Sequence, residues 1–459
     1  MSKRTGGYTP LEPPKGDRQN DRQITEVAGR YFNQYVIAIK IVMCLIESEK
    51  ISAQMIRKSA HGALYDHPSD MEPLVPGDGE GKLANLALVL IREAERLRGL
   101  LHPLTRRLVA DLVRSMNSYY SNLIEGHRTR PKDIDAAIRK DFSANPAARS
   151  LQIQHLAHME VQEEMESRLA GMAAAEVCSV DFLRWIHEGF YRRLPREFRR
   201  IEEDNGKTYE VNPGELRQGE VSVGRHMAPS SKKLGEFLSR FAEFYGPLVT
   251  TRPASLVAAG AAHHRLTWIH PFLDGNGRVA RLFTQAWFVK AGVDGEGLWT
   301  ISRGLARRRS DYQGALANAD LKRVNDFDGR GYLSQRFLEE FCEFFLSTAV
   351  DQAEFMEELL SLDGMLNRIV GYAERQESAK ELPRGTSLVL RETFLRGEIA
   401  RGEVARIIGA SPRTAQKLTA KLLLERLIVS PSPKGVLRLG VPADAAGDYF
   451  PNLYPAGAD

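Results

Sequence analysis

Twelve consecutive residues bring together side chains used in proton transfer and anion binding: His270-Pro-Phe-Leu-Asp-Gly-Asn-Gly-Arg-Val-Ala-Arg281. Histidine has the one side chain whose ordinary pKa suits proton transfer near neutral pH, so His270 is a candidate base. Asp274 supplies a hard carboxylate suited to Mg²⁺, which usually arrives with phosphates and keeps several waters. Arg278 and Arg281 stand three residues apart, where both could bind phosphate oxygens from the first turn of a helix.

A glycine-framed turn lies inside this run. Gly275 and Gly277 permit backbone angles that other residues resist, so the N–H groups around Asn276 can converge on one anion. The apolar residues that follow have helical spacing, which predicts that the turn opens a helix whose N-terminus favours phosphate. Together these residues indicate a site for a magnesium-bound nucleotide with a base beside it. The alternative is a turn that caps an ordinary helix, with His270 in a structural role.

The run matches the motif of the Fic-domain family, His-x-Phe-x-(Asp/Glu)-Gly-Asn-Gly-Arg-x-x-Arg, at every specified position, so the chain resembles Fic proteins. These proteins mostly transfer AMP from ATP to a protein hydroxyl and release pyrophosphate. The resemblance implies that His270 deprotonates a Ser, Thr or Tyr acceptor and that Asp274 holds Mg²⁺. It also implies an anion hole and two guanidiniums for the phosphates of ATP, formed by Gly275, Asn276, Gly277, Arg278 and Arg281.

A second motif, Ser121-Asn-Leu-Ile-Glu-Gly126, ends a segment with an apolar helical stripe. From the residues alone, Glu125 is a solvated helix residue. The motif also resembles the inhibitory helix of many Fic proteins, (Ser/Thr)-x-x-x-Glu-(Gly/Asn), whose glutamate pairs with the second arginine of the catalytic motif, here Arg281. A carboxylate there would remove the cation meant for the γ-phosphate and repel that phosphate. We therefore expect ATP to bind in a displaced pose and the protein to inhibit itself.

Two more segments resemble parts of the family's site. Turn residues and short alternating runs between Tyr209 and Pro229 predict a single hairpin. This hairpin resembles the family's flap, which aligns the target backbone by strand addition; its candidate residues are Val221, Val223, Gly224 and His226. Tyr312 stands where the family places an adenine-contacting helix. Many members have a second tyrosine where Gln313 stands, so Tyr312 is either a pocket residue or a core residue.

The composition is that of an ordinary folded protein of 459 residues, with 43% hydrophobic, 27% charged and 8% aromatic residues. The length allows two or three domains. Because the net charge is only +4, any basic patch must be local. The cysteines Cys44, Cys178 and Cys342 lack metal-type spacing and suit a reducing cytosol as small buried residues. The apolar stretch Val36–Ile46 is too short to span a bilayer, so we expect a cytoplasmic protein with no membrane partner.

Helical spacing of apolar residues dominates the chain, including Asp21–Ser48 and one long helix from Asp311 to about Asp351. We expect a mainly α fold, with a Fic-type helical core, a short β-hairpin flap and a C-terminal winged helix-turn-helix domain. The expected divisions are a disordered tail at 1–16, an N-terminal helical region at 17–103, the Fic domain at 104–350, a helical linker at 351–383, the winged helix-turn-helix at 384–440 and a tail at 441–459.

The C-terminal part is basic, with eleven Lys or Arg against four Asp or Glu between Arg384 and Leu439, an excess of +7. Three helical segments, the third opened by Gly409-Ala-Ser-Pro412, precede two apolar runs on either side of Pro431–Gly435. This order predicts a winged helix-turn-helix. The candidate DNA-binding residues on its recognition helix are Arg413, Lys417 and Lys421. Winged helices also bind proteins, so both kinds of partner stay open.

These patterns favour an auto-inhibited protein adenylyltransferase that uses ATP and Mg²⁺ to modify a hydroxyl of a target protein or of itself. One alternative is removal of AMP, with Glu125 positioning a hydrolytic water. Another is a DNA-binding regulator in which the Fic site senses nucleotide. Transfer of UMP or phosphocholine also fits the motif, and homodimer formation is open.

Overall fold

The computed structural model describes residues 65–202, 206–224 and 226–454, all within one compact unit. This part of the chain is mainly helical, as the sequence predicts, and it carries three small antiparallel sheets. None of its helices is long and apolar enough to cross a bilayer. The tail expected at 1–16, the helix expected at Asp21–Ser48 and Cys44 lie outside the described residues.

Five helices precede the expected flap: α2 (Lys82–Leu100), α3 (Pro103–Ile124), α4 (Pro131–Ile138), α5 (Pro146–Leu169) and α6 (Val180–Arg192). Proline opens α3, α4 and α5, since its fixed φ suits the first turn and its missing N–H costs nothing there. Asn145 and Ser179 cap α5 and α6 by accepting an N–H bond from the first turn. Helical spacing in the sequence predicts helices at about 84–101, 104–123, 131–139, 147–169 and 180–191, so each start falls within two residues of its prediction.

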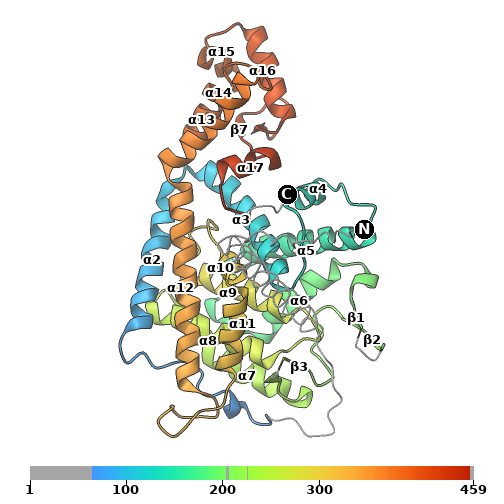
Figure 1. Ribbon diagram of the computed structural model, residues 1–459, viewed down its shortest axis with the longest axis vertical. Coiled ribbons are helices and arrows are strands. Elements are labelled where there is room, and N and C mark those ends of the chain that lie inside the picture. Colours follow the sequence, from blue (N-terminus) through green and yellow to red (C-terminus); the bar gives the residue numbers. More distant parts are fainter. Residues whose placement is uncertain (1–64, 203–205, 225, 455–459) are drawn as a thin grey trace, which may run out of the picture. The chain divides into compact units, whose positions relative to one another are not determined.

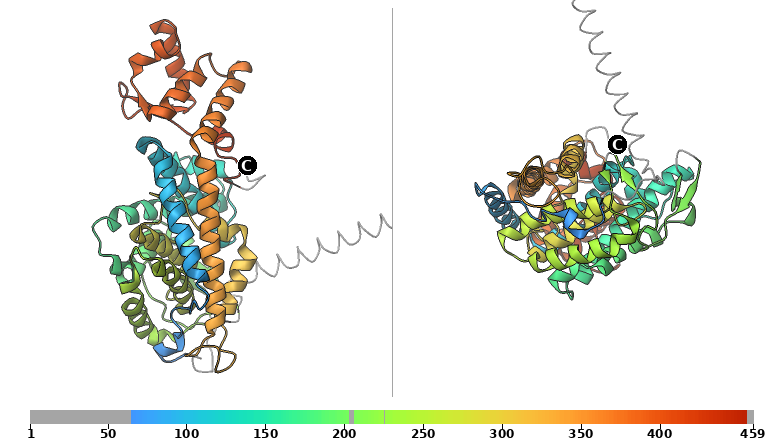
Figure 2. Two further views of the ribbon diagram at one scale, coloured as in Figure 1. Left: turned by 90° about the vertical axis from the view of Figure 1, so that its left-hand side faces the viewer. Right: turned by 90° about the horizontal axis from the view of Figure 1, so that it is seen from below.

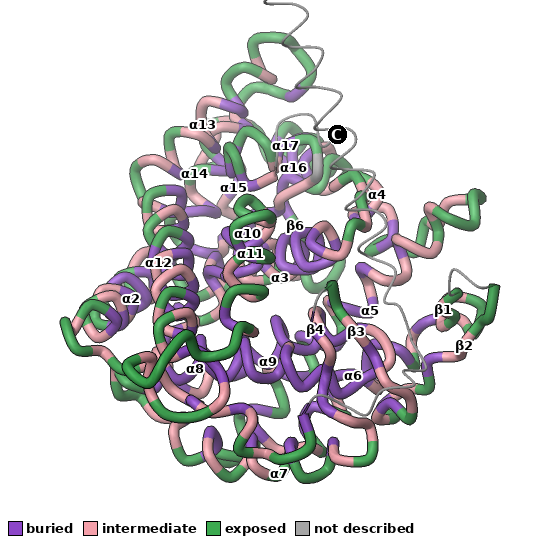
Figure 3. The backbone as a smooth tube through the Cα atoms, turned by 60° about the horizontal axis from the view of Figure 1, so that its bottom comes forward, coloured by how far each residue is buried: buried purple, intermediate pink, exposed green. Residues whose placement is uncertain are grey.

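The core centres on α7 (Leu234–Tyr245), α8 (Pro253–Ile269) and α9 (Asn276–Ala291). Figure 3 shows α9 and much of α8 buried, and Trp268 and Trp287 are among the largest fully buried side chains. The long helices α2 and α12 (Gln335–Leu360) lie side by side (Figures 1 and 2), and both pack on α8. The run from His270 to Arg281 joins α8 to α9, so the most buried pair of helices positions it.

The single hairpin predicted between Tyr209 and Pro229 is wrong, because the structure has two. Strand β1 (Arg200–Glu202) pairs with β2 (Thr208–Glu210), and β3 (Ser222–Val223) pairs with β4 (His226–Met227). The chain between the hairpins is fastened to other elements instead. The Gly214 N–H donates to His187, and the Arg217 N–H donates to the carbonyl of Pro271.

One long helix from Asp311 to Asp351 is also wrong. The segment contains α11 (Arg309–Ala319), a loop and then α12, and α10 (Ser302–Arg307) precedes it. Gly329 and Gly331 in the loop have φ angles of 76° and 111°, which break a helix, and Ser334 caps α12. The domain boundary expected at residue 350 falls inside α12, which continues without a break to Leu360.

The C-terminal elements are α13 (Leu362–Ser378), α14 (Thr386–Arg396), β5 (Glu398–Ile399), α15 (Val404–Ile407), α16 (Pro412–Leu424), β6 (Ile428–Val429), β7 (Leu437–Leu439) and α17 (Ala443–Tyr449). The three strands form one antiparallel sheet in the order β5-β7-β6. The sequence pattern missed β5, and the helix expected at Arg401–Ile408 is a 3-10 turn followed by the short α15. The described part of the segment expected as a tail, residues 441–454, is packed, with Phe450 and Leu453 buried.

Candidate active site

His270 ends α8 in the left-handed region, with φ 51°, and its side chain is buried. Its Nδ1 lies 3.1 Å from the carbonyl oxygen of Thr267. A carbonyl only accepts, so this contact assigns the proton to Nδ1 and makes Nε2 the basic nitrogen. Burial lowers the pKa of His270 to about 4, and the charges of Arg217 and His226 add to that shift. The imidazole is therefore neutral at pH 7 and can accept a proton.

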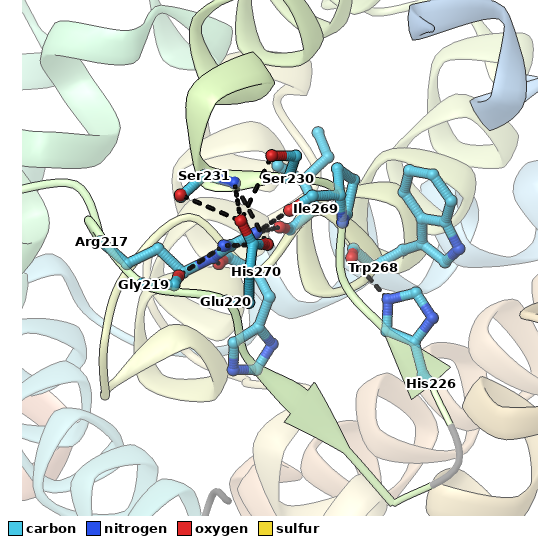
Figure 4. A network of polar contacts seen from close by, with 10 residues as sticks. Arg217, Gly219, Glu220, His226, Ser230, Ser231, Trp268, Ile269 and His270 are labelled. Atoms are coloured by element: carbon cyan, nitrogen blue, oxygen red, sulfur yellow. Dashed lines mark hydrogen bonds and ion pairs between the residues drawn. The ribbon is translucent and has the colours of Figure 1, made fainter. Parts of the chain in front are cut away.

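Arg217 fixes the backbone of His270. Its Nε donates to the His270 carbonyl at 2.8 Å, and its terminal nitrogens donate to the carbonyls of Gly219, Pro229 and Ile269 (Figure 4). Burial lowers the pKa of this guanidinium to about 10, which leaves it charged at pH 7. One buried cation thus ties the segment between the hairpins to the end of α8.

The glycine-framed turn has the geometry that the sequence predicts. Gly275 has φ 80° and precedes α9, and a Cβ there would lie 2.8 Å from the Tyr191 ring. The Asn276 side chain is used inside the turn, where its Oδ1 accepts from the Phe272 N–H and its Nδ2 donates to the Phe272 carbonyl. Asn276 therefore braces the turn that presents the first N–H groups of α9, and anion binding by these groups stays a prediction.

Asp274 lies beside this anion site. Its Oδ2 accepts from the Tyr191 hydroxyl at 2.6 Å, and its carbonyl lies 3.2 Å from Nε2 of His187. Burial opposes ionisation, but Arg278, Tyr191 and the Gly275 N–H together hold the pKa of Asp274 below its usual value. An oriented, ionised carboxylate next to a phosphate site fits Mg²⁺, which takes one or two protein carboxylates and otherwise phosphate and water oxygens.

The two arginines of the run are held by different partners. Arg278 donates to Asn122 on α3 and to Gln154 on α5, and its guanidinium lies over the Phe190 ring, 4.8 Å from the centroid. Arg281 is 2% exposed and lies against the end of α3. Both guanidiniums therefore belong to the same buried region as the anion site.

Ser121 and Glu125 both contact Arg281. The Glu125 carboxylate lies 2.5 Å from its guanidinium, while the Ser121 hydroxyl and carbonyl accept from it at 2.9 and 3.0 Å. Burial opposes ionisation of Glu125, but the charges of Arg281 and Arg278 lower its pKa. A Cβ on Gly277 would lie 2.3 Å from a Glu125 oxygen, so this carboxylate sits against the first turn of α9.

Gly126 ends the helix that carries these residues. It has φ 90°, and its N–H donates to the Leu123 carbonyl while the His127 N–H donates to the Asn122 carbonyl. This pair of bonds is a Schellman motif, which requires a left-handed residue at the position of Gly126. The glycine therefore sets where α3 stops and so where Glu125 points.

Tyr312 and two of the flap residues, Val221 and His226, are more buried than their expected roles suggest. Tyr312 is 3% exposed and its hydroxyl lies 2.7 Å from Nε2 of His263, a core arrangement. Val221 is fully buried, and His226 contacts the Trp268 carbonyl at 2.7 Å, so these two anchor the β3–β4 hairpin (Figure 4). Val223 and Gly224, at the turn of that hairpin, form its exposed part. Nucleotide contact by Tyr312 and target docking by the hairpin stay predictions.

The three candidate DNA-binding residues lie on α16, well apart from this site in sequence. Arg413 and Lys417 are exposed, whereas Lys421 pairs with Glu425 at 2.6 Å.

Sequence patterns did not single out His187, Tyr191 or the role of Arg217. Each acts on the run from a distance of 50 or more residues along the chain. The only local signal for the first two is that polar side chains interrupt the apolar stripe of α6.

The site combines the N–H groups at the start of α9 with the Asp274 carboxylate and the neutral His270. This arrangement defines a class of site that suits a phosphate-bearing ligand. Residues 178–288 match the family model described as "Fic/DOC family". These residues of the chain therefore form a Fic-type domain.

Similar curated proteins carry the name Protein adenylyltransferase Fic. The Protein adenylyltransferase Fic of Drosophila ananassae is 24% identical over 209 residues, which cover 41% of this chain and 41% of that protein. The protein of the same name from Drosophila willistoni is 34% identical over 82 residues, 18% of this chain and 16% of that protein. The chain thus matches less than half the length of these relatives.

Solved structures of similar proteins include a Fic family protein from Desulfovibrio desulfuricans. Its TM-score is 0.46 at 18% identity, covering 80% of this chain and 99% of that chain. Fic-1 from C. elegans has a TM-score of 0.42 at 16% identity, covering 60% of this chain and 72% of that chain.

Proposed function

We propose that this protein transfers AMP from ATP to a Ser, Thr or Tyr hydroxyl of a protein, and that Glu125 inhibits the transfer. The observation that carries the proposal is the contact of Glu125 with Arg281 against the first turn of α9, beside a neutral His270. The Fic/DOC match over residues 178–288 supports the same reaction class.

In the proposed reaction, Nε2 of His270 takes the proton of the acceptor hydroxyl. The hydroxyl oxygen forms a bond to the α-phosphorus of ATP, the bond from that phosphorus to the bridging oxygen breaks, and pyrophosphate leaves. Asp274 would hold Mg²⁺, which would neutralise phosphate charge when bound. The N–H groups at the start of α9 and the Arg278 guanidinium stabilise the charge on the phosphates. A bound triphosphate would also raise the pKa of His270 and strengthen it as a base.

Inhibition follows from the position of Glu125. Its carboxylate neutralises Arg281 and places a negative charge where an outer phosphate would otherwise bind. ATP would then enter only in a displaced pose, with its α-phosphorus out of line with the attacking oxygen.

The test compares wild-type protein, Glu125→Gly and Glu125→Gly/His270→Ala, each incubated with α-labelled ATP and cell lysate. We expect strong labelling of protein bands by the first variant, weak labelling by the wild type and none by the double variant. Labelling that survives loss of His270 would reject the mechanism. Labelled UTP and CDP-choline, offered in parallel, determine which group is transferred.

Removal of AMP is the second candidate, because the Glu125 side chain is 33% exposed and its carboxylate lies within the site. Purified labelled target, obtained with the Glu125→Gly protein, is returned to wild-type protein without ATP. Release of AMP by the wild type and not by Glu125→Gly would assign Glu125 a catalytic role in hydrolysis. A cytoplasmic location and self-modification stay predictions.

A further inference from the structure

The outward face of α16 is uncovered in the part of the chain that the structure describes; its first turns are polar and basic, and Leu424 at its end is 75% exposed. Arg413, Gln416 and Lys417 are exposed along one side, with the small Ala420 next in the same stripe. The opposite side packs inward through Ala415, Leu418, Thr419 and Leu422. The helix is therefore held by its buried stripe while a stripe of hydrogen-bond donors faces away from the protein.

In the basic region from Arg384 to Leu439, ion pairs neutralise every acidic residue but leave several basic residues unpaired among the described residues. All four of its acidic residues are in ion pairs with arginine or lysine of the same region: Glu392, Glu398, Glu403 and Glu425. Arg413 and Lys417 on α16, Arg391 on α14 and Lys434 between β6 and β7 form no ion pair with any residue that the structure describes. The excess of +7 is thus carried by free cations, two of them on the exposed stripe of α16.

The order of the elements around α16 also places Lys434 in the loop between two strands of the sheet. Helix, strand, helix, helix and two strands follow one another from α14 to β7, and β5 closes the sheet beside β7. Ser411 caps α16, and Arg401 donates to the Gly435 carbonyl, which fixes the loop that carries Lys434. This is the order of a winged helix-turn-helix, with α16 as recognition helix and 430–436 as wing.

We infer that this surface binds duplex DNA, with α16 in the major groove and the wing on the adjacent backbone. An α-helix fits the B-form major groove, where arginine and glutamine can contact base edges, while lysine at the wing contacts phosphate. An acidic protein surface could also meet these cations. The exposed donors occupy the first turns of α16, and the exposed Leu424 lies at its C-terminal end. The part of the helix that would enter the groove therefore has no large apolar anchor, which favours nucleic acid, since protein interfaces depend on buried aromatic or aliphatic residues.

The test uses the full chain and a fluorescein-labelled 30-base-pair duplex of mixed sequence, with anisotropy measured between 50 and 200 mM salt. We expect wild-type binding to weaken steeply with salt. Arg413→Ala/Lys417→Ala should raise Kd at least about tenfold and reduce the slope of log K against log salt by about 0.9 for each of the two side chains that contacts a phosphate. Lys232→Ala/Arg252→Ala is the matched control, since it removes one exposed lysine and one exposed arginine far from α16 in sequence.

Three outcomes would overturn the inference: no binding by the wild type at 50 mM salt, equal binding by the α16 variant, or equal loss in the control. A duplex RNA of the same sequence should compete weakly, because its deep, narrow major groove does not admit a helix. Equal competition by RNA would reject major-groove docking. AMP transfer by the same proteins carrying Glu125→Gly reports the Fic site separately.

A second inference concerns the end of the described chain, the segment Asn452–Tyr454, which lies on α3. The Tyr120 hydroxyl donates to the Leu453 carbonyl at 2.8 Å, and the Tyr454 ring packs on those of Tyr119 and Tyr120. Arg303 donates to the Asn452 carbonyl at 2.9 Å. These contacts adjoin Ser121, the first residue of the motif that holds Arg281.

We propose that Asn452–Tyr454 acts as a strap that keeps α3 in its inhibiting position, an inference that rests on the proposed inhibition by Glu125. The strap adds two aromatic contacts and a hydrogen bond to the last turns of α3, so releasing it should let that end of the helix move away from Arg281. A partner that displaces the strap would thereby activate transfer.

Tyr454→Ala tests the strap, with Tyr332→Ala as a control for loss of a tyrosine elsewhere. We expect Tyr454→Ala to raise AMP transfer several-fold over wild type and to speed hydrogen exchange in the last turns of α3, and to have a smaller effect on transfer when Glu125→Gly is already present. Equal transfer and exchange in Tyr454→Ala and wild type, with Glu125→Gly active, would reject the strap alone. An inactive Glu125→Gly protein would instead reject the proposed function.

Discussion

Replacing Glu125 by glutamine should separate the charge of this residue from its shape. The glutamine keeps the length of the side chain and one oxygen that can accept from Arg281, but it removes the negative charge that now lies 2.5 Å from the guanidinium. A hydrogen bond to a charged group contributes about 1.5–3 kcal/mol. The bond between Glu125 and Arg281, with charge on both partners, belongs at the upper end of that range, and the glutamine bond, with charge on Arg281 alone, belongs at the lower end. The inhibited state should therefore lose about 1–1.5 kcal/mol in Glu125→Gln, which corresponds to about a 5- to 13-fold rise in transfer.

Glycine removes the whole contact, so Glu125→Gly should gain about 10- to 150-fold, from the full 1.5–3 kcal/mol. The assay is the initial rate of AMP incorporation from labelled ATP, with the dissociation constant of ATP measured by calorimetry as a readout that needs no target. His270→Ala in each background is the control for labelling that does not use the site. If Glu125→Gln matched the wild type while Glu125→Gly was active, the block would be steric, and the electrostatic reasoning would be refuted.

Four further predictions concern residues of the run and residues that support it. In apo protein, histidine NMR with His270→Gln for assignment should show the Nδ1–H tautomer of His270 and protonation only near pH 4, so a midpoint near 6.5 contradicts the burial argument. Arg217→Lys in the Glu125→Gly background should lower kcat about tenfold or more with little change in ATP affinity, since lysine cannot bind four carbonyls at once; an unchanged kcat would remove its positioning role. Tyr191→Phe in that background should raise the Mg²⁺ concentration for half-maximal transfer about tenfold, because Asp274 loses its orienting bond. Gly275→Ala should reduce the free energy of unfolding in urea by at least about 1 kcal/mol, from its φ of 80° and the Tyr191 ring.

The sequence predicts the parts of the fold and site that depend on local spacing. Helical periodicity places α2 to α9, and the turn at Gly275 follows from residue types alone. The family pattern predicts the contact of Glu125 with Arg281, and the structure contains it, while its inhibitory role stays a prediction. The pattern does not predict the contact of Ser121 with Arg281.

The rest depends on tertiary contacts that no local pattern encodes. Tyr191 reaches Asp274 across 83 residues, and Arg217 reaches the His270 carbonyl across 53. The sequence predicts one hairpin where the structure has two, because Pro213 and Gly214 resemble an ordinary hairpin turn. In the structure the Gly214 N–H instead donates to His187. Partner choice by a backbone N–H cannot be read from the residue that carries it.

The position of Arg281 also limits how far a change at Glu125 alone can activate the protein. Besides the carboxylate, the guanidinium contacts the hydroxyl and the carbonyl of Ser121, and the carbonyls at the end of a helix carry partial negative charge. The end of α3 as a whole therefore occupies the place of an anionic ligand, and Glu125→Gly leaves two of its three contacts with Arg281. Full release requires α3 to move, so Glu125→Gly/Ser121→Ala should transfer AMP faster than Glu125→Gly by about tenfold or more, the value of one further hydrogen bond to a charged group. Equal rates for these two proteins would mean that Glu125 alone blocks the phosphate, and that α3 can stay in place while ATP binds productively.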